Sequence, residues 1–599
     1  MVSAIRRMGV AGDALAEYFM DPIDFQDAST EPAKVSMDCV HPSYFWIVIF
    51  VALGMVSGVG CDRSKPLSGT DSVPGAIEVR SGSPRSERPL PNAATFDPST
   101  EVFSFRGVHA LKLGISESNI DKLQRDERPY VRASMEESGR AIFSTIGVKL
   151  KGAAGSFQGF DGKPGFTLNM DKYEKGVRFH SLDKFHLNNS VQDDTYLNEW
   201  LGSEVFRRAH YPAPRVAHAV LTINERPPEL YVLREGYDEI LIQRFFTAAK
   251  GNLYDGGFVQ DLDAELEKDA GDGVDDHSDL RTIATRLGSG DFQARVEGLS
   301  ELIDLDRFLT FFALERMVAH WDGYCNSANN YRLYLDPDSN RAVFLPHGMD
   351  QIFGDIGMPL FDPNGALVAR VVMSSDTLRS QYREKVRELM PIFYPPDELL
   401  EAIEEKSVQL QESIGDLGEA FQDQHRQKVE DLKQRIRERA ENMLAQLEEA
   451  DPVPIEIPLK GSVPLDSWYP STDGDRIAAT VSGEGTTDEC FKVDFLGEQS
   501  GMGAWRCPML LSRGKYFLRG RFRVSELQPL DAENLETIVY GTQRDERWLR
   551  WEGDAMWQEI AMEIMVLEDR ASVEVLVGVR GAAGNLVIDR KSMRLERLE

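Results

Sequence analysis

The sequence predicts an α+β protein that ends in a separate all-β module, and two observations support this prediction. Between about residues 98 and 450, short runs of alternating apolar residues are mixed with longer stretches in which apolar residues recur every three or four positions, the spacing of a helix. After residue 453, short alternating runs separated by Gly-containing turns predominate. A chain of 599 residues is long enough for several such folding units.

Composition excludes several classes of protein. The chain has 67 Lys and Arg against 98 Asp and Glu, a net charge of −31, which argues against a nucleic-acid-binding protein because phosphate neutralisation needs a net basic face. With 42% hydrophobic and 28% charged residues, the bulk is globular, and a multi-span transporter is excluded. Five cysteines without a CxxC pair exclude a disulfide scaffold and give no sign of a structural zinc site.

The first 64 residues predict a targeting or anchoring segment. An uncharged apolar run of seventeen residues, 44–60, is followed directly by Cys61. Two interpretations stand level: a bacterial lipoprotein signal, in which Cys61 is lipidated, and an uncleaved single membrane anchor, with a buried core helix as a distant third. Both leading interpretations predict an exported protein held at the membrane of the cell envelope. Residues 65–97 are rich in Pro, Ser and Gly without an apolar period and predict a flexible linker.

The next segment predicts strands around a small-residue turn. Residues 109–115 and 141–151 alternate as strands do, and 116–126 predict a short helix. The turn Gly-Ala-Ala-Gly-Ser at 152–156 leads to a second strand that begins near Lys163. A strand, a small-residue turn and a strand with a lysine open the N-terminal lobe of a kinase, although a tight hairpin turn favours the same residues.

Further motifs follow in a fixed order. They are His186-Leu187-Asn188-Asn189, a helix-like stretch at 196–209, His320-Trp321-Asp322, Asn329-Asn330 before a strand, and His347-Gly348-Met349-Asp350. This ordered series resembles the spore-coat-protein-H (CotH) kinase family over roughly residues 105–450. The resemblance implies an atypical protein-kinase-like bilobal fold over 98–450, and an exported enzyme that transfers the ATP γ-phosphate to Ser or Thr of a surface or secreted protein.

The resemblance also implies roles for particular residues. Asp322 would be the catalytic carboxylate that receives the proton of the acceptor hydroxyl. Asn330, with Asn329 as the alternate, and Asp350 would hold Mg²⁺ beside ATP, with Mn²⁺ or Ca²⁺ as substitutes. Many members of the family carry Trp-Asp-x-Asp where this chain has Gly348 two residues before Asp350. The missing carboxylate raises a second hypothesis, a weak or inactive kinase-like scaffold that binds a surface or a carbohydrate.

The lysine that contacts the ATP phosphates has two candidates. Lys163 is preferred because it begins the strand after the turn, and Lys151, before the turn, is the alternative. The glutamate partner of this lysine should come from the helix-like stretch, where Glu204 and Glu199 are too far apart to face one lysine together.

Two other segments carry predictions of their own. Residues 255–281 contain ten acidic and two basic residues and predict a solvated insertion near the active site, without the spacing of an EF-hand calcium loop. Residues 453–599 predict a β-sandwich that holds five of the eight tryptophans. Exposed tryptophans would bind polysaccharide, whereas buried ones would only build the core, and Cys490 and Cys507 are candidates for a disulfide.

Overall fold

A computed structural model describes residues 97 and 99–599, except 126–127, 154, 289, 474–475, 484–488, 497–500, 530–535, 544, 551–552 and 554–555. The chain divides into two compact units, 1–87 and 88–599, and every described residue belongs to the second. The predictions for the apolar run 44–60, for Cys61 and for nearly all of the linker therefore lie outside the described residues. In the part that is described, no helix is both long and apolar enough to cross a bilayer.

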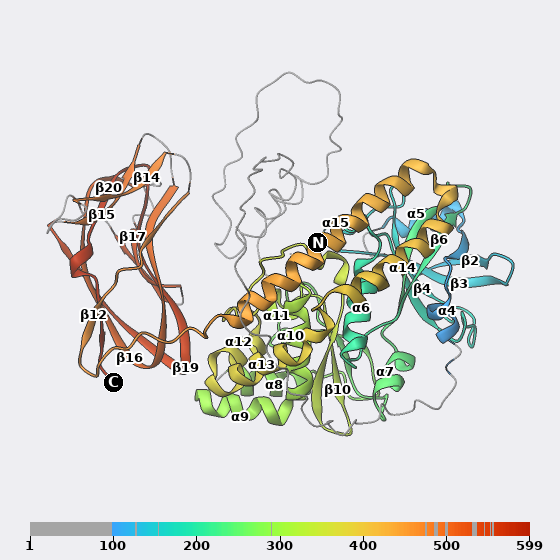
Figure 1. Cartoon of the computed structure of the whole chain (residues 1–599), viewed down its shortest axis with the longest axis horizontal. Coiled ribbons are helices and arrows are strands. Elements are labelled where there is room, and N and C mark those ends of the chain that lie inside the picture. The colour runs from blue at the N-terminus through green and yellow to red at the C-terminus, as the bar shows by residue number, and fades with distance from the viewer. Residues whose placement is uncertain are drawn as a thin grey trace, which may run out of the picture. The chain divides into compact units, whose positions relative to one another are not determined.

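The first body of the structure is a closed barrel of seven strands in the order β1-β2-β3-β4-β5-β7-β6 (Figure 1). The strands are β1 (His109–Gly114), β2 (Val131–Glu137), β3 (Ala141–Lys151), β4 (Gly165–Asn169), β5 (Lys184–Asn188), β6 (Val216–Ile223) and β7 (Glu229–Glu235). Neighbours are antiparallel except β1 and β6, which pair in parallel and close the barrel. The helices α4 (Thr100–Ser104), α5 (Glu117–Leu123) and α6 (Asn198–Arg208) flank these strands in sequence.

Alternation along the barrel strands separates an apolar interior from a polar outer face. Leu150, Phe166 and Leu187 are at most 2% exposed and belong to the barrel core. The intervening residues form a row across four strands, in which Lys149, Thr167, His186 and Arg234 lie opposite one another in turn. Because neighbouring side chains in a strand point to opposite faces, this row points away from the core. The barrel thus carries a polar stripe on its outside.

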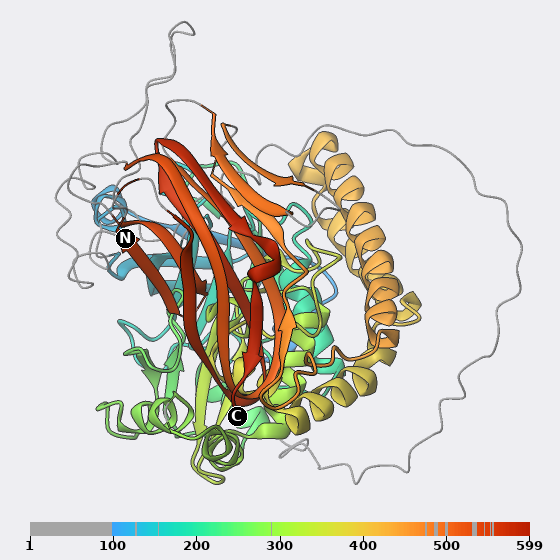
Figure 2. The same ribbon diagram turned by 90° about the vertical axis from the view of Figure 1, so that its left-hand side faces the viewer.

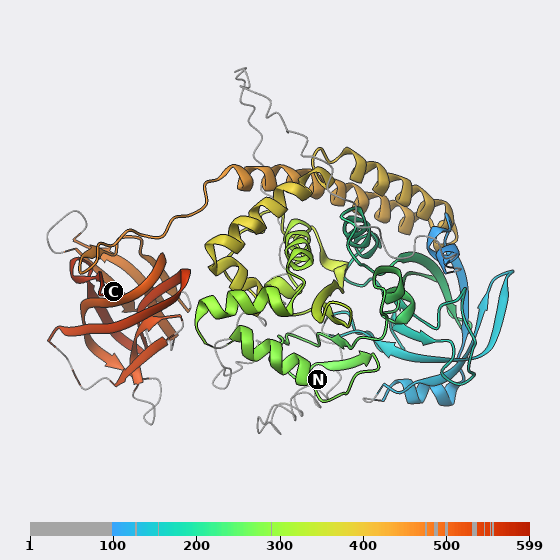
Figure 3. The same ribbon diagram turned by 90° about the horizontal axis from the view of Figure 1, so that it is seen from below.

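The second body combines helices with a four-stranded sheet in the order β11-β10-β8-β9. The strands are β8 (Leu253–Asp255), β9 (Glu267–Ala270), β10 (Tyr331–Asp336) and β11 (Arg341–Pro346). The helices are α7 (Glu239–Phe245), α8 (Ser278–Gly288), α9 (Phe292–Leu302), α10 (Leu305–Met317), α11 (Tyr324–Ser327), η2 (Met349–Gln351), α12 (Leu367–Ser374), α13 (Asp376–Leu389), η3 (Met390–Ile392), α14 (Asp397–Ser413), η4 (Gly415–Leu417) and α15 (Glu419–Glu448). Figures 1 and 3 show α14 and α15 lying along each other.

The helix α15 carries a stripe of apolar side chains, and this stripe packs within the molecule. Val429, Leu432, Ile436 and Met443 are at most 2% exposed and belong to the same core as α10 and α13. An apolar stripe that is already buried within its own chain leaves no seam for a second helix. The stripe therefore serves as a core-facing surface rather than as a coiled-coil dimer interface.

The acidic segment 255–281 is folded rather than a simple solvated loop. It contributes β9 and the start of α8, and two of its carboxylates have buried partners. Asp261 accepts hydrogen bonds from the Tyr324 hydroxyl at 3.0 Å and from the Leu367 N–H at 2.6 Å, and Asp279 accepts from the Tyr254 hydroxyl at 2.9 Å. Some of the carboxylates in this segment thus accept hydrogen bonds that hold the sheet and its neighbours in place.

The ten strands of the C-terminal residues are hydrogen-bonded into one continuous sheet, and side chains from both halves of its long strands enclose a single core (Figure 2). Its strands are β12 (Ser462–Pro464), β13 (Tyr469–Thr472), β14 (Ile477–Ser482), β15 (Cys490–Phe495), β16 (Gly501–Gln528), β17 (Glu536–Thr542), β18 (Asp545–Arg550), β19 (Gln558–Gly581), β20 (Ala583–Asp589) and β21 (Arg594–Arg597), with the short helix η5 (Arg590–Ser592). The strands stay connected because the two longest, β16 and β19, pair with each other over most of their length. Their pairing has one irregularity, between Ser512 and Gly514.

The tryptophans and cysteines of this sheet differ in part from expectation. Trp505 is 4% exposed and stacks on Phe491, with 4.4 Å between the ring centroids, so it belongs to the core. Trp557 is 36% exposed and lies under the guanidinium groups of Arg521 and Arg523. Trp551 lies outside the described residues. Cys490 and Cys507 lie on β15 and β16 and are not joined in a disulfide, which corrects the predicted pairing.

Candidate functional site

The loop that carries Asp322 is anchored to the end of α10 by one buried carboxylate. Glu315, which is 1% exposed, accepts hydrogen bonds from the N–H of Tyr324 at 3.1 Å and of Cys325 at 2.8 Å. The imidazole of His320 lies between two partners, with Nδ1 at 3.7 Å from Glu315 and Nε2 at 3.1 Å from the Gly348 carbonyl. Although burial lowers the pKa of His320, the adjacent Glu315 carboxylate outweighs it and raises that pKa.

Two asparagine amides hold the carboxylate of Asp322. The Nδ2 of Asn329 donates to Oδ1 at 2.9 Å, and the Nδ2 of Asn330 donates to Oδ2 at 2.8 Å. Burial raises the pKa of Asp322, and the two amides together with His320 oppose the rise. The carboxylate is therefore fixed in one orientation while each oxygen keeps a lone pair for another donor.

The two asparagines differ in what their side-chain oxygens do. The Oδ1 of Asn329 accepts a hydrogen bond from the Val259 N–H at 3.3 Å. Asn330 has a left-handed backbone, with φ at 49°, and its Oδ1 faces Gly348. No donor within the described ranges bonds to the Asn330 oxygen, so of the two it is the better placed to accept an external ligand.

Gly348 occupies a position that disfavours a side chain. Its φ is +57°, in the left-handed region, and a Cβ atom there would lie 2.4 Å from the Oδ1 of Asn330. Both observations require a glycine unless Asn330 moves. The departure from the Trp-Asp-x-Asp pattern is thus built into the local backbone.

Lys151 lies on the polar side of the barrel, where the charges of Glu199 and Asp350 act on it. Its Nζ donates to the Oδ1 of Asn188, and the Nδ2 of Asn188 donates to Glu199 on α6 at 3.0 Å. Burial, followed by the charge of Arg234, lowers the pKa of Lys151 to about 8, against the opposing effect of Glu199 and Asp350. Burial, and then the Glu199 carboxylate, raise the pKa of Asp350 to about 7.

The preferred lysine and one candidate glutamate lie elsewhere. The Nζ of Lys163 donates to the Tyr196 hydroxyl at 2.7 Å and lies 4.5 Å from the centroid of the Tyr196 ring. Glu204 bonds to Arg207 at 2.5 Å and to Arg208 at 3.1 Å. The structure therefore brings Lys151 and Glu199, not Lys163 and Glu204, to Asp350.

A divalent cation can be tested against the residues that are present. No group of three or more His, Cys, Asp or Glu side chains suited to a metal occurs in the described ranges. The oxygens of Asp350 and Asn330 are nonetheless hard ligands of the kind that Mg²⁺ prefers, and Mg²⁺ often keeps several waters and takes only one or two protein carboxylates. Burial, and then the Glu199 carboxylate, raise the pKa of Asp350, and a bound cation would favour its ionised form. The residues thus fit Mg²⁺ bound largely through phosphate oxygens.

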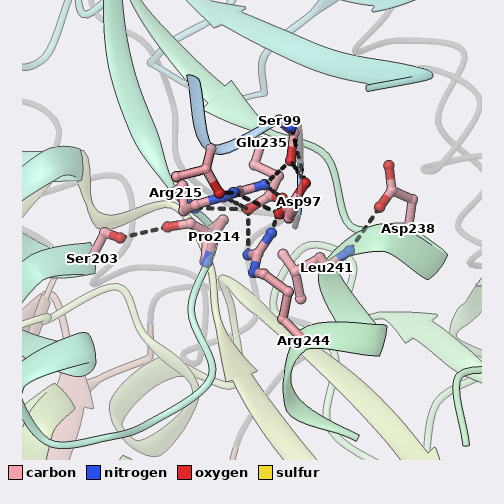
Figure 4. Close-up of polar contacts among 10 residues, drawn as sticks. Asp97, Ser99, Ser203, Pro214, Arg215, Glu235, Asp238, Leu241 and Arg244 are labelled. Atoms are coloured by element: carbon pink, nitrogen blue, oxygen red, sulfur yellow. Dashed lines mark hydrogen bonds and ion pairs between the residues drawn. The ribbon is translucent and has the colours of Figure 1, made fainter. Parts of the chain in front are cut away.

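A separate ion-pair network braces the barrel near its N-terminal end (Figure 4). Glu235 is fully buried and accepts from Arg215 at 2.7 Å and from Arg244 at 2.6 Å. Although burial opposes it, the two arginines lower the pKa of Glu235 to about 2. Arg215 also pairs with Asp97 at 2.9 Å, so this network fixes the start of the described chain.

A small hollow adjoins this network. Its lining comes from α4, α6 and the start of β6 and comprises Thr100, Phe103, Ser104, Trp200, Ser203, Glu204, Arg207, Arg215 and Val216. None of the side chains around Asp322 or Asp350 contributes to it. We therefore assign the candidate active site to the polar clusters and not to this hollow.

Comparison with known proteins matches the part of the chain that contains these clusters. The family described as "CotH kinase protein" matches residues 148–443. Invasin CotH7 of Rhizopus delemar is 24% identical over 195 residues, which cover 28% of this chain and 31% of the relative. Invasin CotH3 of the same fungus is 38% identical over 60 residues, 10% of each chain. Residues 148–443 therefore carry a CotH kinase domain, although the chain matches less than a third of the length of these curated relatives.

Solved structures resemble a smaller part of the chain. TmCBM61 in complex with beta-1,4-galactotriose covers 22% of this chain and 90% of its own, at 15% identity and a TM-score of 0.17. The CBM22-1 xylan-binding domain from Paenibacillus barcinonensis covers 23% and 88%, at 8% identity and a TM-score of 0.15. At these TM-scores neither likeness supports a conclusion about fold or ligand.

Proposed function

We propose that residues 98–450 form an atypical, two-lobed protein kinase that transfers the γ-phosphate of ATP to a Ser or Thr hydroxyl of a surface or secreted protein. One observation carries the proposal: the His320–Gly348 hydrogen bond joins the loop of Asp322 to the loop of Asp350, whose charge acts on Lys151. Phosphoryl transfer needs these parts, namely a carboxylate for the acceptor proton, a cation on the phosphates and oxygen ligands for the metal.

In the proposed reaction, each residue has a defined task. Asp322 accepts the proton of the acceptor hydroxyl as its oxygen forms a bond to the γ-phosphorus. The bond from that phosphorus to the bridging oxygen breaks, and ADP leaves with the electron pair. Lys151 neutralises phosphate charge, and Asn188 with Glu199 keeps its side chain in place. Mg²⁺, when bound to Asp350 and Asn330, would neutralise charge on the same phosphates.

Transfer of labelled phosphate tests the proposal directly. Full-length protein incubated with Mg²⁺ and γ-labelled ATP should label itself or added envelope proteins on Ser or Thr. Asp322→Asn should abolish the label, whereas Asp338→Asn, in the exposed turn between β10 and β11, should keep it. Absence of label from the wild type, or full labelling by Asp322→Asn, would contradict the proposal.

Gly348 and the C-terminal sheet together favour one second function, an inactive scaffold that binds polysaccharide. Gly348 removes the first family carboxylate, and Trp557 is the most exposed of the tryptophans that the structure describes in the C-terminal sheet. A half-exposed indole offers a face for a sugar ring. If polysaccharides raise the melting temperature of the full-length protein while Mg-ATP does not, this second function is favoured.

A further inference from the structure

Arg234 on β7 is a buried cation with most of its donors unused. The side chain is 1% exposed, and its Nη2 donates to the Nε2 of His347 at 3.2 Å. Its Nε and Nη1 atoms are buried without a hydrogen-bond partner among the residues that the structure describes. Two donors of a permanently charged group are therefore withdrawn from water without an acceptor.

His347 adds a third unused donor to this group. An arginine nitrogen can only donate a hydrogen bond, so the Nε2 of His347 accepts and the ring is neutral. A neutral imidazole that accepts at Nε2 carries its proton on Nδ1. The Nδ1 atom is likewise buried and unpartnered in the described part of the chain. Arg234 and His347 thus present three donors.

Other buried arginines of this protein are treated differently. Arg439, fully buried, donates to the backbone carbonyls of Met317 at 3.2 Å, Arg316 at 2.7 Å and Met358 at 2.7 Å. Arg332, half-buried beside the same cluster, donates to Asp255 at 2.6 Å, and its Nε lies 3.2 Å from the Asp269 carboxylate although it makes no hydrogen bond. Since an uncompensated buried charge is strongly destabilising, the unpaired donors of Arg234 call for an anionic partner that is not part of the protein.

The position of Arg234 indicates which anion. It lies in the polar stripe, opposite His186 of β5, and its charge acts on Lys151. Tyr237 holds the pair from the side, with its ring stacked on His347 at 5.8 Å between centroids. Arg234 and His347 thus lie close enough to Lys151 to interact with it electrostatically, beside the proposed nucleotide. A planar guanidinium with free nitrogens matches two phosphate oxygens.

We propose that Arg234 and His347 form an oxyanion site that binds a phosphate group of the nucleotide beside Lys151. This inference rests on the proposed function. Arg234 is a positioning residue: it fixes the phosphate chain, whereas Asp322 handles the acceptor proton.

Thermal shift and binding measurements on the full-length protein test the site. Inorganic tripolyphosphate, Mg-ATP and adenosine serve as probes, because they separate phosphate binding from base binding. Arg234→Met should leave the melting temperature of the ligand-free protein unchanged or higher, and weaken tripolyphosphate binding at least tenfold. Mg-ATP binding should weaken with it, and adenosine binding should not change. Arg332→Met, which removes a neighbouring cation that already has carboxylate partners, should weaken tripolyphosphate binding much less.

Each outcome of these measurements either supports the anion site or overturns it. A lower melting temperature for ligand-free Arg234→Met, with an unchanged tripolyphosphate affinity, would overturn the site in favour of a structural role. If that variant does not fold, Arg234→Lys keeps the charge without the fork, and unchanged tripolyphosphate binding in it would equally overturn the site. Tripolyphosphate binding that depends on Arg234 in a protein that transfers no phosphate would uphold the anion site and reject the kinase. No binding of tripolyphosphate or Mg-ATP by the wild type would reject the site itself.

Discussion

The Nε2 of His320 lies 3.1 Å from the carbonyl oxygen of Gly348, and this contact joins the two loops on which the proposed chemistry depends. One loop carries Asp322 and the other carries Asp350, and they are separated by the hairpin of β10 and β11 in sequence. The Nδ1 atom of His320 lies 3.7 Å from the Glu315 carboxylate, so the ring is bonded at one nitrogen and faces a negative charge with the other. Small changes at His320 should therefore affect catalysis more than folding.

His320→Gln should lower the rate of phosphate transfer while costing about 1–3 kcal/mol of unfolding free energy, the usual effect of leaving a buried hydrogen-bond partner unsatisfied. Urea denaturation measures the stability and labelled ATP the rate. His210→Gln, at an exposed position after α6, is the control and should change neither. A rate equal to that of the wild type would show that the two loops align without this contact.

Gly348→Asp restores the carboxylate of the family pattern but should reduce both stability and activity. The left-handed backbone and the 2.4 Å approach to Asn330 impose strain of about 1–3 kcal/mol. Gly354→Asp is the matched control, because a Cβ atom there would meet nothing within 4 Å. A more active Gly348→Asp protein would mean that Asn330 yields readily and that the glycine is not required.

Lys151→Met should weaken ATP binding at least about tenfold, since it removes a charged contact to the phosphates. Lys163→Met should leave ATP affinity unchanged and lower stability, because the Tyr196 hydroxyl loses its partner. Isothermal titration with Mg-ATP compares the two variants. If Lys163→Met weakened ATP binding and Lys151→Met did not, Lys163 would be the residue that contacts the phosphates.

The pKa of Lys151 gives a pH dependence of defined sign. The ammonium is charged below about pH 8, so ATP affinity should fall as the pH rises through that value, and Lys151→Arg should remove the fall. In the ligand-free protein the effect on stability is opposite. Between pH 8 and 10.5 the unfolded chain holds a proton that the folded chain lacks, so this group makes the fold more stable as the pH rises.

Glu235→Gln should cost about 3–5 kcal/mol of stability, because Arg215 and Arg244 lose their buried anion. In the wild type, the stabilisation from Glu235 is complete above its unfolded pKa of 4.5 and is lost as the pH falls towards about 2. Denaturation at pH 7 and pH 3 should show a smaller difference between variant and wild type at the lower pH. Glu239→Gln, exposed on α7, should resemble the wild type at both. If the difference in unfolding free energy between Glu235→Gln and the wild type were the same at both pH values, this account would be refuted.

Cys61→Ser separates the two interpretations of the N-terminal segment. If Cys61 is lipidated, the variant should lose labelling by a fatty-acid analogue and leave the membrane fraction. If residues 44–60 are an uncleaved anchor, the variant should remain in that fraction. Recovery of the wild type in the soluble cytoplasmic fraction would contradict both.

The sequence was most informative where motifs are short and contiguous. Asp322 and Asp350 could be located because each follows a recognisable local pattern. The choice between Lys151 and Lys163 could not be made in this way, because it depends on how β3 pairs with β4, where Lys151 lies opposite Gly165. The sequence did hold one indication in favour of Lys151. Ile146, Val148 and Leu150 alternate along β3 and point inward, so Lys151 must lie on the outer face of the barrel.

Long-range pairing explains the other differences. In the sequence, Arg234 is one residue within an apolar strand. Only the pairing of β7 with β5 and β6 shows that its side chain lies on the face away from the barrel core. The length of the C-terminal strands was likewise hidden, because Pro508 and Gly514 suggest strand ends, whereas β16 continues through both. Register between distant segments is not a property that composition or local period can specify.

The parallel pairing of β1 with β6 also bears on how the chain reaches its fold. Leu111 lies opposite Leu221, so the first strand remains an open edge until the ribosome has added the residues of β6. Contacts so distant in sequence form slowly, and an unpaired edge invites association with other chains. Nascent chains of this protein should therefore depend on holdase chaperones until the barrel closes.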